Sequence, residues 1–270
     1  MSLVSKSFAC TAAACSLAIA SPAWAALYTF EEANQLAENF SGFSNFSQSA
    51  TGGIDDSGSI ALTSTSQVAV ENASFDASSG SFAISSFFQY NGANSGGRGF
   101  FVGLTSDSTD TYSSSATTTG TDLRVIVTGS GSSDNYGIAL INNATTFAGS
   151  SLNVPLVTGE WYQLVLNVGP AVGGQFTAIS GELLDDDGVS LKNLNNDGLG
   201  GYTQTTSLTS DTEAHAFFGG QNPTSRAASN ADNFFSPSDV PASDAVIPEP
   251  GSLGLLALGS VLMLRRRSQS

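Results

Sequence analysis

The chain has 270 residues, with 23 Asp and Glu against eight Lys and Arg. Between Ala26 and Val246, 22 residues are acidic and only four are basic, so this span carries a net charge of −18. Nucleic-acid binding requires Lys and Arg to neutralise phosphate, and this composition argues against it. Both cysteines, Cys10 and Cys15, precede this span, which therefore has no disulfide and no thiolate ligand or nucleophile.

Residues 1–25 have the layout of a secretory signal peptide. Lys6 lies in a short basic start, and an apolar run extends from Phe8 to Ala20. Ala23 and Ala25 form an A-x-A cleavage pattern with the residue between them. We predict a signal helix that signal peptidase removes after Ala25, so that the protein is exported. The alternative is a buried N-terminal helix.

Residues 26–235 contain short β-favouring runs separated by turn residues, and a short helix or turn is expected over Glu31–Asn39. The expected strands are Gln67–Glu71, Ser81–Tyr90, Arg98–Thr105, Asp122–Thr128, Tyr136–Ile141, Trp161–Val168, Gln175–Leu184 and Ala214–Gly219. Several alternate apolar and polar residues with a period of two, which indicates one buried face. Without alternating helices, this pattern predicts an all-β domain, a two-sheet antiparallel jelly-roll sandwich. Residues 236–246 are rich in Pro, Ser and Asp and are expected to be a linker.

Trp161 and Tyr162 are candidates for an aromatic surface that binds sugar. Adjacent residues of a strand face opposite sides, so only one of the two can point into the core. The other is then available to a ligand. The alternative is that both pack in the core, at the boundary between sheet and loop.

Calcium is a possible cofactor, because oxygen ligands gather in two places: Asp185 and Asp187, and Asn193, Asn195 and Asp197. The second group resembles the front of a calcium loop, but its twelfth position lacks the bidentate Glu. The first group ends in Asp-Gly, which is typical of a hairpin turn. A solvated turn and a polar surface loop are the alternatives.

Catalytic groups are sparse in this sequence. His215 is the only histidine, and it alternates with alanines as an ordinary strand residue does. No serine lies in a nucleophile-elbow motif. Glycoside hydrolysis needs two carboxyl groups at a controlled separation, and the consecutive aspartates near residue 186 do not share one strand face. We therefore expect no catalytic residue.

The C-terminal segment 247–270 combines Pro248, Glu249 and Pro250 with an apolar stretch and three arginines, Arg265, Arg266 and Arg267. As a helix, residues 251–264 would be about 21 Å long, short of a hydrocarbon core of about 30 Å. The arginines would hold the end of the chain on the cytoplasmic side. This pattern predicts a transmembrane segment that serves as a temporary handle. A permanent weak anchor is the alternative.

Two family resemblances follow from these motifs. The tail resembles the PEP-CTERM sorting signal of Gram-negative bacteria, which implies processing by an exosortase, transient insertion in the inner membrane, and association with exopolysaccharide. The body resembles laminin-G-like and concanavalin-like jelly rolls, whose members often bind carbohydrate or protein and sometimes calcium. The segments that carry this second resemblance are Gly99–Leu104, Gly159–Leu166, Gly181–Gly188 and Asp232–Phe234.

Three functions are consistent with these observations. The first is a non-enzymatic cell-surface or matrix protein that binds glycan or a partner protein. The second is a glycan-active enzyme, a glycosidase or lyase, on the same fold. The third is a structural surface protein with no ligand.

Replacing Pro248, Glu249 and Pro250 together with alanine should leave unprocessed protein in the inner membrane, because the recognised motif is lost while the apolar stretch remains. Cell fractionation and mass spectrometry of the C-terminus measure this. The matched control replaces the linker residues Pro241, Ser243 and Asp244 with alanine. Normal release of the first variant would contradict the sorting role.

Overall fold

The computed structural model describes residues 25–63, 66–93, 96–106, 108–109, 122–129, 131, 135–142, 145–149, 153–172, 176–194, 202–204, 213–221 and 228–238. The expected signal helix, the linker from residue 239 onward and the C-terminal segment lie outside this set. Within it, no helix has the length and apolar character needed to span a membrane.

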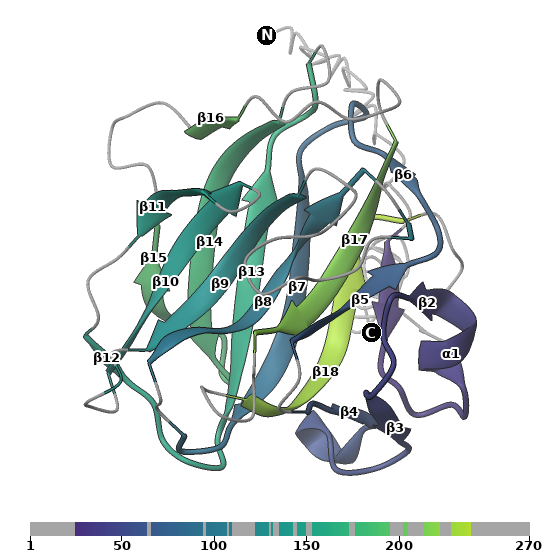
Figure 1. Ribbon diagram of the computed structural model, residues 1–270, viewed down its shortest axis with the longest axis vertical. Coiled ribbons are helices and arrows are strands. Elements are labelled where there is room, and N and C mark those ends of the chain that lie inside the picture. The colour runs from purple at the N-terminus through teal and green to yellow at the C-terminus, as the bar shows by residue number, and fades with distance from the viewer. Residues whose placement is uncertain are drawn as a thin grey trace, which may run out of the picture.

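The described chain forms two antiparallel β-sheets packed face to face (Figure 1). Sheet I has the order β15 (Ser190–Asn193), β14 (Phe176–Asp185), β13 (Trp161–Val168), β7 (Phe82–Tyr90), β18 (Ala228–Ser236), β4 (Ser59–Ala61) and β3 (Ser47–Ser49), with β1 (Ala26–Tyr28) on β18 and β16 (Tyr202–Gln204) on β14. Sheet II has the order β11 (Thr145–Gly149), β10 (Asn135–Asn142), β9 (Asp122–Gly129), β8 (Gly97–Thr105), β17 (Glu213–Gly220), β5 (Gln67–Glu71) and β2 (Phe40–Ser41), with β12 (Val154–Pro155) on β10 and β6 (Phe75–Asp76) on β17. Helix α1 (Gln35–Asn39) and a 3₁₀ helix, η1 (Ile54–Asp56), complete the described elements.

The eight expected strands are all present, and each agrees with its predicted bounds to within one residue at either end. The segment Asp232–Phe234, one of those that carry the family resemblance, is part of β18, and the helix expected within Glu31–Asn39 is α1. The all-β sandwich is thus confirmed. Strand β11 and the short strands β1 to β4, β6, β12, β15 and β16 were not predicted; the short strands have two to four residues, too few to show a period.

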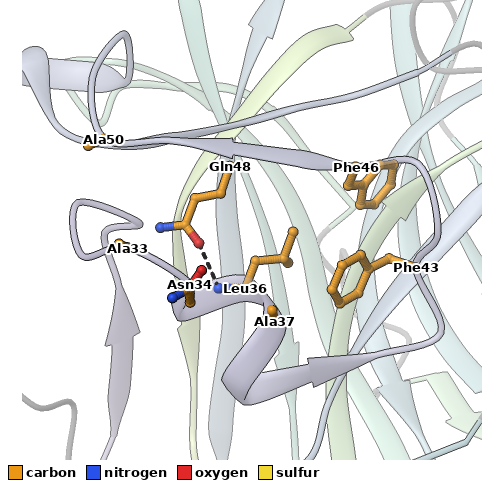
Figure 2. Close-up of a pocket in the computed structure, with 8 residues that line it drawn as sticks. All are labelled: Ala33, Asn34, Leu36, Ala37, Phe43, Phe46, Gln48 and Ala50. Carbon is orange, nitrogen blue, oxygen red and sulfur yellow. Dashed lines mark hydrogen bonds between the residues drawn. The ribbon is translucent and has the colours of Figure 1, made fainter.

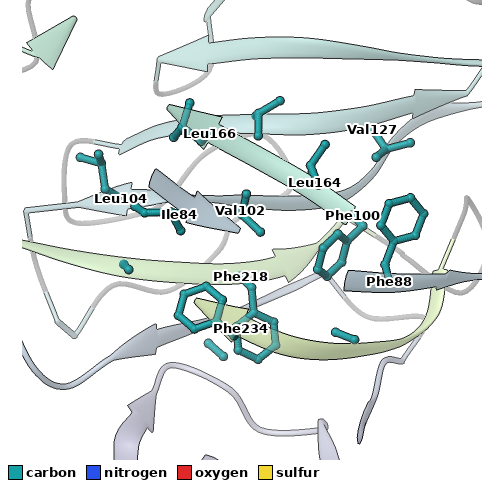
Figure 3. Packing of buried hydrophobic residues seen from close by; sticks show 14 of the residues in the cluster. Ile84, Phe88, Phe100, Val102, Leu104, Val127, Leu164, Leu166, Phe218 and Phe234 are labelled. Carbon is teal, nitrogen blue, oxygen red and sulfur yellow. The ribbon is translucent and has the colours of Figure 1, made fainter. Parts of the chain in front are cut away.

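The main hydrophobic core fills the space between the two sheets. Along β13, Tyr162, Leu164, Leu166 and Val168 are buried while the residues between them are partly exposed, as the alternation predicted. Aromatic rings from both sheets meet in this layer (Figure 3), with the Phe218 and Phe234 centroids 5.1 Å apart. Edge and offset contacts of this kind stabilise a core beyond the area they bury.

A second buried cluster lies on the other face of sheet II. Its side chains alternate along their strands with residues of the main core; they are Val68, Val70, Phe101, Ile126, Ala139, Ile141 and Phe217. Arg124 is fully buried beside them, and its guanidinium carbon lies 5.2 Å from the centre of the Phe101 ring. This is a cation–π contact. Strands β8, β9 and β10 are therefore apolar on both faces.

The two ends of the domain meet in sheet I, where Ala26 pairs with Ser236 and Tyr28 with Phe234. A fully buried carboxyl from sheet II fastens this junction, because Tyr28 Oη donates to Glu71 Oε1 over 2.6 Å. Ser238 Oγ donates to the same oxygen. Burial raises the pKa of Glu71. One side chain of sheet II thus holds both the first strand and the exit from the last.

Tyr28→Phe should lower the free energy of unfolding by about 1–3 kcal/mol, because it removes a donor from a buried carboxyl. Urea denaturation measures this. Val172→Ala is the control: its side chain is 75% exposed, and its effect should stay within about 0.5 kcal/mol. Equal stability of Tyr28→Phe and the wild type would show that the junction contributes little.

Candidate functional site

Trp161 and Tyr162 face opposite sides of sheet I, as the parity argument required. Tyr162 points into the core with 5% of its surface exposed, and its hydroxyl accepts a hydrogen bond from Val157 N over 2.8 Å. Burial raises the pKa of Tyr162. Trp161 is partly exposed, on the face directed away from the core. The sugar-surface hypothesis therefore rests on Trp161, since Tyr162 has a packing role.

Strand register places further side chains beside Trp161. Trp161 on β13 pairs with Gln89 on β7, which in turn pairs with Asn230 on β18. Two residues farther along β13, Gln163 pairs with Phe87 of β7. All five are partly exposed and share the outward face of sheet I. We call this group, Phe87, Gln89, Trp161, Gln163 and Asn230, the platform.

Hydrogen bonds fix the amide groups of the platform. Gln89 Oε1 accepts from Asn230 Nδ2 over 2.9 Å, and Gln89 Nε2 donates to Gly159 O over 3.0 Å. Gln163 Nε2 donates to Ser85 Oγ over 3.1 Å. Gln89 Oε1 also accepts from Ser229 Oγ over 3.3 Å, which fills both of its acceptor sites. Each amide nitrogen has two hydrogens, so these bonds orient the groups while leaving donor capacity for a ligand. The platform is thus preorganised.

Asp232 lies beside the platform on the same outward face of sheet I, covered by the loop that contains η1. It pairs with Phe87, and its carboxylate accepts hydrogen bonds from Ile54 N (2.9 Å), Ser57 Oγ and Asn233 N (2.6 Å). A Cβ at Gly53 would lie 2.2 Å from Asp232 Oδ2, so only glycine lets the loop approach. Burial raises the pKa of Asp232 to about 6, outweighing these hydrogen bonds. The side chain is fully buried, so it positions the loop and does not meet a ligand directly.

The acidic hairpin, Asp185–Gly188, forms a turn, which was the alternative to a calcium site. Asp185 Oδ1 accepts from Val189 N over 2.7 Å, and Gly188 adopts a φ of 78°. Asp187 is exposed, and Asn193 Nδ2 donates to Glu182 Oε1 over 3.0 Å. Asn195 and Asp197 lie outside the described residues. In the part of the chain that is described, no three acidic or histidine side chains gather as metal ligands. Calcium binding therefore stays a prediction.

His215 has a structural role on β17. Its Nδ1 lies 3.0 Å from the carbonyl oxygens of both Glu71 and Ala73. Since carbonyl oxygens only accept, Nδ1 carries the hydrogen. The ring therefore fastens β17 to the end of β5 and to the residues that follow it.

A hollow of about 380 Å³ lies between α1 and the segment from Phe43 to Ala50 (Figure 2). Ala33 and Ala37 line it together with Phe43. Its main polar group is already engaged, because Gln48 Oε1 accepts from Leu36 N over 2.8 Å and Gln48 Nε2 donates to Phe30 O over 2.8 Å. No acidic or basic side chain lines it, so the hollow has no group for acid–base chemistry.

Comparison with protein-family models gives a match over residues 246–268, to the PEP-CTERM protein-sorting motif. The chain carries a PEP-CTERM sorting motif. The expected tail residues from Pro248 to Arg267 all fall within the match. The sorting motif implies processing by an exosortase and marks the chain as an exported protein of the cell surface. A comparison with curated proteins gives no match.

Solved structures similar to the body have the concanavalin-like sandwich. The PL-14 alginate lyase of the marine animal Aplysia kurodai aligns with a TM-score of 0.50 and 9% identity, over 80% of this chain and 99% of the lyase. Lectin I-B4 from Griffonia simplicifolia, in a metal-free form, aligns with a TM-score of 0.47 and 12% identity, over 78% and 98%. Lectin UEA-II, in complex with galactose, gives 0.46 and 15%, over 78% and 97%. At such identities the likeness shows the fold alone, and a fold does not by itself fix a function.

The Asp232 carboxyl should make stability fall as pH rises from about 4 to about 6. In this window the folded state keeps a proton that the unfolded state has lost, so raising the pH favours unfolding. Relative to Asp232→Asn, the wild type should lose up to about 1.4 kcal/mol per pH unit there. Urea denaturation across this range measures the slope. Parallel curves for the two proteins would contradict the assignment.

Proposed function

We propose that this protein is an exported, non-enzymatic cell-surface or matrix protein whose sandwich binds extracellular polysaccharide on the platform. The observation that carries the proposal is Trp161, a partly exposed indole held beside oriented amide groups on the outward face of sheet I. An aromatic face accepts the apolar C–H face of a sugar ring, and amides exchange hydrogen bonds with sugar hydroxyls.

The shape of the face suits a polymer. Enclosed pockets surround a small ligand on most sides, whereas the platform spans three neighbouring strands of a sheet. Strands lie about 4.8 Å apart, so the platform extends about 10 Å across the sheet. An extended chain of sugars can cross such a surface and continue beyond it.

The carboxyl groups near the platform do not favour a glycosidase. Asp232 is fully buried beneath the loop that follows Gly53, and Glu182 is the outward-facing carboxylate on the neighbouring strand β14. Hydrolysis of a glycosidic bond needs two carboxyl groups that both reach the substrate. A ligand-free structural protein would not need an oriented aromatic and amide surface, so binding is the function that we favour.

Export and sorting complete the proposal. Signal peptidase would cut after Ala25, and the exosortase would act at Pro248–Pro250 after transient insertion of residues 251–264 in the inner membrane of a Gram-negative cell. The body would then reach the cell surface or the extracellular polysaccharide. Its charge of −18 would keep it soluble there.

Trp161→Ala should weaken polysaccharide binding about fivefold to thirtyfold, the effect of losing a central aromatic contact. Affinity electrophoresis of the Ala26–Val246 body in gels that contain the producing cell's own polysaccharide, or reference polymers, measures this. Trp161→Tyr should retain part of the affinity, and Val172→Ala all of it. The proposal fails if the wild-type body, shown to be folded by circular dichroism, binds no polysaccharide.

A further inference from the structure

The charged groups beside the platform are acidic. Glu160 directly precedes Trp161 and is exposed. Glu182 is partly exposed and pairs with Val165 on the outward face of β13, where Gln163 also lies. Asp186 is exposed at the tip of the adjacent hairpin. Carboxylates therefore border this end of sheet I along two strands.

The field of these carboxylates reaches the start of β13. Burial is the main reason for the raised pKa of Tyr162, and the charges of Glu160, Asp186 and Asp185 raise it further. Tyr162 adjoins Trp161 in the chain but faces the core, so this shift shows that these carboxylates lie near the start of β13.

Basic side chains of the described residues lie elsewhere. Arg98 and Arg124 are on strands of sheet II, and Arg124 is buried against Phe101. Lys192 pairs with the inward-facing Leu183, and its Nζ donates to Asn153 Oδ1 over 3.2 Å. Asn153 in turn bonds to Tyr136 of sheet II, so Lys192 is directed away from the platform. A uronic-acid polymer would therefore meet repulsion on the outward face of sheet I, with no described cation to offset it.

We infer that the platform binds a polysaccharide whose sugars carry protonated primary amino groups, such as a partly N-deacetylated amino-sugar polymer. This inference rests on the proposed function. Trp161 would stack on a sugar ring, and Glu160 would receive the ammonium group of that sugar or its neighbour. Glu182 lies across from Val165, about 13 Å along the strand from Trp161, so it would contact a more distant sugar of the same chain.

The test compares two ligands with the same backbone: the hexamer of N-acetylglucosamine and its fully deacetylated form. Titration calorimetry with the exported chain, purified from producing cells, gives both dissociation constants at low and at physiological ionic strength. The deacetylated hexamer should bind about tenfold more tightly at low ionic strength, and the ratio should shrink as salt screens the charges.

Two pairs of variants separate local from general attraction. Glu160→Gln with Glu182→Gln should bring the two affinities within about twofold of each other. The control, Glu38→Gln with Glu213→Gln, changes the net charge equally at exposed sites on α1 and β17 and should keep the tenfold ratio. Trp161→Ala should weaken the binding of both hexamers.

Each remaining outcome overturns a defined claim. Equal binding of the two hexamers would refute the preference for amino groups and leave polysaccharide binding intact. Binding of the deacetylated hexamer that survives Trp161→Ala at full strength would show a general attraction of a polycation to an acidic protein, and would refute the platform as its site. If neither hexamer nor any other polysaccharide binds, the proposed function itself is wrong.

Discussion

The pairing of the first strand with the last is the constraint on which the sandwich depends. Strand β1 joins sheet I through β18, and β18 also pairs with β7 at the centre of that sheet. The buried carboxyl of Glu71 ties this junction to sheet II through Tyr28 and Ser238. A domain without disulfides thus closes its two ends by register and by one buried polar cluster. The same strands fix the geometry of the platform, since β7 supplies Phe87 and Gln89 and β18 supplies Asn230.

Much of the fold could be read from the sequence because strand alternation is local information. The alternation in Trp161–Val168 and Phe82–Tyr90 marked both the strands and their buried faces. The role of Glu71 could not be read, because its partners lie 43 and 167 residues away. The second apolar face of sheet II had a signal, since unbroken apolar runs such as Phe100–Val102 indicate strands buried on both sides.

Part of the candidate site could be predicted from the sequence. Parity required Trp161 and Tyr162 to face opposite sides, and the structure assigns the outward side to Trp161. Gln89 and Asn230 gave no signal, because isolated amides in strands are common and only the register brings these two beside the indole. Their mutual hydrogen bond spans 141 residues of sequence. The platform is therefore a product of sheet topology, which a single sequence does not specify residue by residue.

The register of sheet I also gives the domain a mechanical polarity. Phe235, where the chain leaves β18, pairs with Ser85, whereas Trp161 pairs with Gln89, about 13 Å farther along β7. A tail held at the cell surface and a polymer held on the platform would therefore pull on the sheet from different ends. That tension would run along β7 and β18, across hydrogen bonds perpendicular to the strands. Those hydrogen bonds would be loaded in shear, so they would bear the force together instead of breaking one after another.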